Sequence, residues 1–84
     1  MQRPIINING TDPRILLEDY RETKRLAVAL REKLDRMWPH DRDYQTHYDP
    51  RAGFQLATNE HVQRLLSVRK LIVELEMLAE SVIR

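Results

Sequence analysis

The chain has 84 residues, no cysteine and a net charge of +1, and 32% of its residues are charged. Such a chain forms one small domain with little core, and no disulfide or thiolate metal site can stabilise it. The near balance of charges excludes a polybasic nucleic-acid binder. The longest apolar run is only three residues and the start lacks a signal-peptide pattern, so we expect a soluble, cytoplasmic protein without a membrane span.

Residues 1–12 are predicted to form an N-terminal arm. Pro4 opposes an early helix, and the isoleucines that follow it favour extended backbone. The arm could form a short strand or lay its isoleucines on the helices, and disorder is the alternative. We expect an arm that is ordered by the rest of the chain or by a partner.

Residues 13–38 are predicted to form the first helix. Asp12 can cap it, Pro13 suits the first helical position, and Pro39 ends it because the residue before a proline avoids helical angles. Its seam positions follow each other at alternating steps of four and three: Leu16, Tyr20, Thr23, Ala27, Leu30, Leu34 and Met37. This seven-residue repeat predicts a coiled-coil-like seam.

Residues 58–83 are predicted to form the second helix, after a connector and helix entry over residues 39–57. The same heptad gives its seam: His61, Leu65, Val68, Ile72, Leu75, Ala79 and Val82. Within that seam we expect His61 to be a partly buried packing residue. An earlier start at Pro50 stays open because residues 49–51 repeat the Asp-Pro-Arg of residues 12–14, although Gly53 would weaken that segment by about 1 kcal/mol.

The predicted fold is therefore all-α, an antiparallel two-helix hairpin. Between Leu65 and Ile83, 12 of 19 residues are apolar, more than one partner helix can cover. We expect two hairpins to form a homodimeric four-helix bundle, although a different protein would cover the surface equally well. The predicted self-association residues are Leu16, Leu30, Leu34, Leu65, Ile72, Leu75 and Val82.

Charge is distributed unevenly along the predicted hairpin. Residues 24–70, the connector half, carry ten basic and six acidic side chains, a net charge of +4. The remaining residues, where both termini meet, carry four basic and seven acidic side chains, a net charge of −3. A rod with a mildly basic tip and an acidic base follows.

The connector holds most of the unusual chemistry of the chain, because three of the five aromatic residues lie between Trp38 and Tyr48. Long ordered connectors are often functional, and aromatic and arginine residues carry much of the energy of interfaces. We expect Trp38 and Tyr44 to anchor a protein partner, with Arg42 as the charged anchor. The predicted partner-binding residues are Trp38, His40, Arg42, Asp43, Tyr44 and Tyr48. The alternative is that the aromatic residues only plug the open end of the bundle.

Three other functions were weighed for this region. Five possible metal ligands match no familiar spacing, so we predict no metal and no cofactor: His40, Asp41, Asp43, His47 and Asp49. Without a nucleophile elbow or a phosphate-binding glycine loop, we expect no enzyme. Nucleic-acid binding at the basic end is the alternative function, with phosphate contacts from Arg31, Arg36, Arg42, Arg51, Arg64, Arg69 and Lys70.

Residues 38–44, Trp-Pro-His-Asp-Arg-Asp-Tyr, contain a Pro-His-x-Arg-Asp-Tyr stretch. This stretch resembles one in small helical proteins of phages and prophages, which share the layout of two amphipathic helices around a turn. The resemblance implies an accessory or inhibitor protein that binds a host or phage protein, and it carries over no active site.

Overall fold

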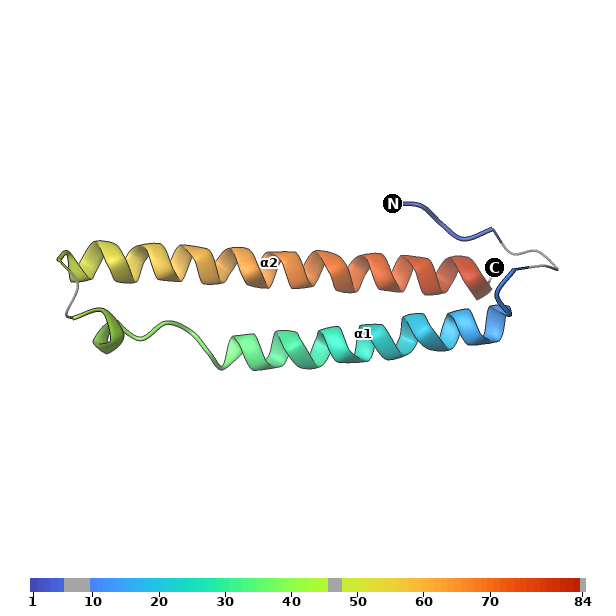
Figure 1. Ribbon diagram of the computed structural model, residues 1–84, viewed down its shortest axis with the longest axis horizontal. Coiled ribbons are helices and arrows are strands. Elements are labelled where there is room, and N and C mark those ends of the chain that lie inside the picture. The colour runs from blue at the N-terminus through green and yellow to red at the C-terminus, as the bar shows by residue number, and fades with distance from the viewer. Residues whose placement is uncertain (6–9, 46–47, 84) are drawn as a thin grey trace.

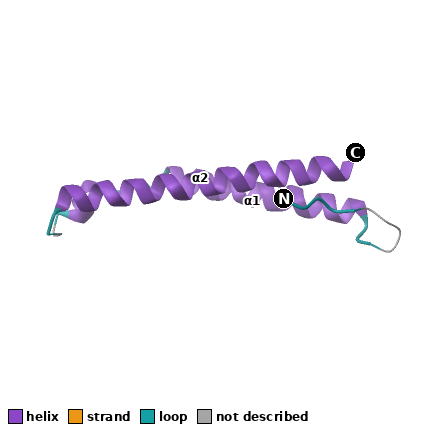
Figure 2. Ribbon diagram, turned by 90° about the horizontal axis from the view of Figure 1, so that it is seen from above, coloured by secondary structure: helices purple, strands orange, loops and turns teal. Residues whose placement is uncertain are grey.

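The computed structural model describes residues 1–5, 10–45 and 48–83. The described chain contains α1 (Pro13–Asp35), the short 3₁₀ helix η1 (Asp41–Tyr44) and α2 (Pro50–Ile83). The two long helices lie antiparallel and side by side, which confirms the predicted all-α hairpin (Figure 1). The molecule is a rod with extents of 61 × 20 × 17 Å, and its termini lie at the same end (Figures 1 and 2). Within these ranges, no helix is long and apolar enough to cross a membrane.

The start of α1 follows from local chemistry. The Arg14 amide donates to Asp12 Oδ1 at 2.9 Å, and the Leu16 amide donates to the Asp12 carbonyl at 3.0 Å. Pro13, in the first helical position, has no amide hydrogen that would need a partner. The bond from the Arg14 backbone, aided by its guanidinium, lowers the pKa of Asp12 below its ordinary value. The predicted N-terminus of this helix is confirmed.

The end of α1 was predicted wrongly. The helix stops at Asp35, three residues before the predicted end at residue 38. The Met37 amide donates to the carbonyl of Leu34 at 3.0 Å, three residues back and not four as in an α-helix. The chain then turns away from the direction of α1. This early exit carries Trp38 toward α2, where its ring finds a contact.

The predicted start of the second helix at residue 58 was also wrong, and the alternative start at Pro50 is the one that the structure has. α2 begins at Pro50, because the Ala52 amide donates to Asp49 Oδ1 at 3.1 Å and the Gly53 amide to the Asp49 carbonyl at 3.0 Å. Thr58 lies inside the helix, where its hydroxyl donates to the Phe54 carbonyl one turn back. A strong cap therefore outweighs the single glycine, and α2 is 34 residues long against 23 for α1.

A small apolar core joins the two helices. Its buried members are Ala27 of α1 and Val68, Ile72 and Leu75 of α2. The partly buried side chains that pack on them are Tyr20, Val28 and Leu34. The short side chain at Ala27 lets the helices approach closely. Four buried apolar residues make a modest core for a chain of this length.

The face that α1 turns toward α2 differs from the predicted seam. Ala27 is buried as predicted, but Leu30 is 49% exposed and Met37 is 52% exposed. Lys24 and Arg31 are partly buried in their place. Long basic side chains can bury their aliphatic stems while their charged ends reach a partner.

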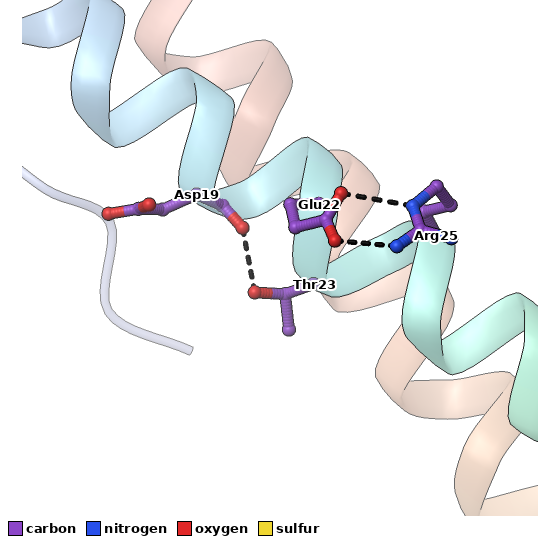
Figure 3. A network of polar contacts seen from close by, with 4 residues as sticks. All are labelled: Asp19, Glu22, Thr23 and Arg25. Carbon is purple, nitrogen blue, oxygen red and sulfur yellow. Dashed lines mark hydrogen bonds and ion pairs between the residues drawn. The ribbon is translucent and has the colours of Figure 1, made fainter.

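A polar network on the outer face of α1 supports the helix locally (Figure 3). The Arg25 guanidinium donates to both carboxylate oxygens of Glu22 at 3.0 and 2.6 Å. These bonds lower the pKa of Glu22 and raise that of Arg25. The Thr23 hydroxyl donates to the Asp19 carbonyl at 2.7 Å. The exposed Thr23, a predicted seam residue, thus uses its hydroxyl within its own helix.

The described part of the N-terminal arm has no regular secondary structure. Ile5 is 86% exposed, whereas Ile6 and Ile8 lie outside the described residues. Arg3 borders a hollow of about 250 Å³ together with Met77 and Glu80 of α2. The beginning of the arm therefore lies beside the C-terminal part of α2 (Figure 1).

Candidate functional site

The connector between the long helices, residues 36–49, is the candidate site. We predicted that it would form the tip of the hairpin. Because α2 begins early and α1 ends early, residues 36–45 of the connector instead run alongside the first turns of α2 (Figure 1). Part of the connector therefore lies against α2.

A ring contact fixes the start of the connector. The Trp38 and His61 ring centroids are 4.6 Å apart, with the planes tilted by 58°. His61 is only 3% exposed, and its Nε2 lies 2.8 Å from the Leu34 carbonyl oxygen. A carbonyl oxygen can only accept, so Nε2 carries the hydrogen of this bond. His61 thus joins α2, the last turn of α1 and the connector, and it is a packing residue as expected.

A second ring contact holds η1 against α2. The Tyr44 and Phe54 ring centroids are 6.2 Å apart, with an interplanar angle of 55°. This spacing and tilt are typical of favourable aromatic pairs, which contribute about 1 kcal/mol beyond their buried area. Beside them lies a hollow of about 340 Å³, lined by Asp41, Gln45, Pro50, Arg51 and Phe54.

Between these contacts, His40 organises η1. Its Nδ1 accepts from the Arg42 amide at 3.3 Å and from Arg42 Nε at 3.4 Å, which caps the short helix. The same Nδ1 lies 3.1 Å from Asp41 Oδ1. Nδ1 accepts a hydrogen bond only when it carries no hydrogen, so the two Arg42 N–H groups match the tautomer that has its hydrogen on Nε2.

The predicted partner-binding residues divide into two groups. Trp38 and Tyr44 use part of their rings to hold the connector, although Trp38 remains 46% exposed. The others are exposed: His40, Arg42, Asp43 and Tyr48. Tyr48 is the most accessible aromatic residue, with a relative exposure of 106%. The rings of Trp38 and Tyr44 therefore make contacts within the chain, whereas Tyr48 and Arg42 are exposed.

The predicted self-association residues also divide. Ile72 and Leu75 are buried inside one hairpin, and Leu34 packs on that core. Leu30 is half-exposed, and the rest are partly buried: Leu16, Leu65 and Val82.

No three His, Asp or Glu side chains converge into a metal-binding group among the residues that the structure describes, and His47 lies outside them. A second hollow, of about 380 Å³, lies between the long helices and is lined by Arg31, Asp35, Leu65 and Arg69.

The contact between Trp38 and His61 was not predicted from the sequence. Both residues stood out separately, one as an aromatic in the connector and one as a polar residue in an apolar seam. Their pairing depends on where both helices end, which no spacing in the sequence records. The strong Asp49-Pro50 cap was the available signal for the longer α2.

No protein-family model, no curated protein and no solved structure matches this chain.

Proposed function

We propose that this chain is a small protein–protein interaction module whose connector, residues 36–49, binds a larger protein. The observation that carries the proposal is the way the connector is mounted. Two ring contacts, Trp38 with His61 and Tyr44 with Phe54, hold its backbone on α2 while other side chains face solvent. A recognition segment held in place before binding loses less conformational entropy when it binds.

The exposed side chains have the composition of an interface. Tyr48 and the free part of Trp38 offer aromatic surface, and Arg42 offers a planar charged group. Tyrosine, tryptophan and arginine are the residues that most often carry interface energy. A partner with an apolar groove beside an acidic side chain fits this set. An accessory or inhibitor protein would work by such contacts.

The test is affinity capture from the native cell with the tagged protein and two double variants. Arg42→Ala with Tyr48→Ala removes exposed connector side chains and leaves both ring contacts in place. Arg21→Ala with Ile15→Ala is the matched control, because it removes one exposed arginine and one exposed apolar residue from α1. We expect one stoichiometric partner that the connector variant loses and the control keeps.

The same experiment separates the alternative function. A partner retained by the connector variant contradicts the proposal. Recovery that disappears after nuclease treatment, and that weakens steeply with salt, favours nucleic-acid binding instead, because phosphate contacts depend strongly on salt.

A further inference from the structure

The hairpin leaves large apolar side chains uncovered on both helices. Leu26 is 54% exposed and Leu30 49% exposed on α1, while Leu71 is 43% exposed and Leu66 48% exposed on α2. Single exposed leucines are ordinary, but several on adjoining helices form a patch. The position of each around its helix decides which of them belong together.

The total surface indicates how large a partner the hairpin can accommodate. Its accessible area is 6891 Å², whereas a compact folded chain of this mass has about 5,300 Å². The excess of about 1,600 Å² exceeds the roughly 800 Å² that each partner buries in a standard interface, and it suits a permanent homodimer. A second folded chain is therefore an occupant of suitable size.

One side of the contact between α1 and α2, the polar flank, is charged. Lys24 Nζ lies 3.0 Å from Glu76 Oε1 across the helices. On the same side, Arg31 and Asp35 of α1 face Arg69 of α2 around the hollow between the helices. These five residues define the polar flank.

The opposite side, the leucine flank, consists of Leu26 and Leu30 of α1 with Leu71 and Leu78 of α2. At about 100° per residue, the residues three before and four after a contact position lie on one side of the helix face that makes the contact. The residues one before and three after it lie on the other side. In α1 the contact position is Ala27. Lys24 and Arg31 of the polar flank lie three before and four after it, whereas Leu26 and Leu30 lie one before and three after it.

The same geometry holds around Ile72 in α2. The polar-flank residues Arg69 and Glu76 lie three before and four after it, whereas Leu71 lies one before it. Leu78, six residues after Ile72, lies near Leu71 around the helix. Since the ion pair and the hollow bring the polar sides of both helices together, the leucine sides must also face the same way.

A further apolar stripe runs along α2 alone and comprises Val62, Leu66, Val73 and Met77. It lies about 100° from Ile72, beyond the polar flank, which separates it from the contact with α1. The leucine flank, by contrast, is a two-helix surface, the kind that pairs with its own copy in a four-helix bundle.

We propose that a second copy of this chain docks on the leucine flank, antiparallel to the first, and completes a four-helix bundle. Charge sets the orientation. Residues 24–70 carry a net charge of +4 and the remainder −3, so antiparallel copies place unlike halves together, whereas parallel copies place like halves together. A two-fold axis across the rod produces this arrangement. This self-association is a property of the purified chain and does not depend on the protein that binds the connector.

Light scattering on purified variants tests the docking surface. We expect the wild type to have twice the mass of the 10.1 kDa chain and Leu30→Glu to have the single-chain mass with its helical circular dichroism retained. Leu66→Glu is the matched control, because Leu66 is 48% exposed and Leu30 is 49% exposed, and it should keep the doubled mass. Leu71→Glu repeats the test from α2, so an unfolded Leu30 variant does not leave the question open.

Several results overturn the proposal. They are a single-chain mass for the wild type, a mass above two chains, a doubled mass in both leucine-flank variants, or dissociation of Leu66→Glu. The orientation of the two copies is tested separately with a spin label. The chain has no cysteine, so Ala52→Cys supplies a single attachment site for the label near the connector end. Antiparallel copies should separate the two labels by a distance approaching the 61 Å length of the rod. A separation within the roughly 20 Å width of a bundle overturns the antiparallel orientation.

Discussion

Replacing His61 by alanine removes a side chain that contacts both the last turn of α1 and the connector. The variant loses a hydrogen bond to the Leu34 carbonyl, about 1 kcal/mol, and the ring pair with Trp38, about 1 kcal/mol. The cavity left at a 3% exposed position adds about 1–2 kcal/mol. We expect the free energy of unfolding to fall by about 3–4 kcal/mol, a large fraction of the stability of a small domain.

Urea denaturation measures this loss with two probes at one fixed protein concentration. Far-ultraviolet circular dichroism follows the helices, and the fluorescence of Trp38, the only tryptophan, follows the connector. His61→Leu keeps apolar volume but loses the hydrogen bond and the ring pair, so about half of the effect should remain. Gln63→Ala, at an exposed position of the same helix, should stay within about 0.5 kcal/mol of the wild type. A loss below about 0.5 kcal/mol in His61→Ala, with unchanged Trp38 emission, would refute this reasoning.

Three further predictions concern the ends and the contact of the helices. Asp49→Ala removes the cap of α2 and should cost about 1 kcal/mol in thermal unfolding, while Asp49→Asn should restore most of it; equal stability of the two variants contradicts the cap. Because the Arg14 amide lowers the pKa of Asp12 in the folded state, the stability from this carboxylate is complete above about pH 4 and is lost as the pH falls through the folded-state pKa. Asp12→Asn should therefore flatten the acid limb of a stability profile, and an unchanged limb counts against the bond. A double-mutant cycle on Lys24 and Glu76 should give a coupling below about 1 kcal/mol that weakens in 1 M salt, and a coupling insensitive to salt would show that the pair is more buried than described.

The amphipathic pattern and the first cap were enough to predict the all-α hairpin and the start of α1. The end of α1 was not predictable in the same way. Pro39 predicts that the helix ends before it, but not by how many residues, and the structure has the end at Asp35 together with a contact between Trp38 and His61.

The sequence also does not determine which residues of α1 face α2. Tyr20, Ala27 and Leu34 recur every seven residues and fit two heptads equally well. One adds Leu30 between them and the other adds Arg31. Apolarity favours the first heptad, but the structure uses the second, in which Lys24 and Arg31 are partly buried and Lys24 reaches Glu76 of α2. The choice left the leucine flank exposed.

The sequence singles out the connector as a candidate site, but it does not predict how the side chains of this segment are arranged. Composition alone identifies the stretch from Trp38 to Tyr48 as unusual. Which aromatic residues hold the connector and which face solvent depends on the course of the chain along α2, and that course depends on the early start of α2 at Pro50.

Hydrogen–deuterium exchange of this protein, alone and with its captured partner, tests the central claim most directly. A connector that is mounted on α2 and binds the partner predicts protection of amides within residues 36–49 when the partner is added. The helices should show little change except where α2 supports the connector, near Phe54 and His61. Protection confined to the leucine flank, or to the far ends of the rod, would contradict the account and move partner binding to another surface.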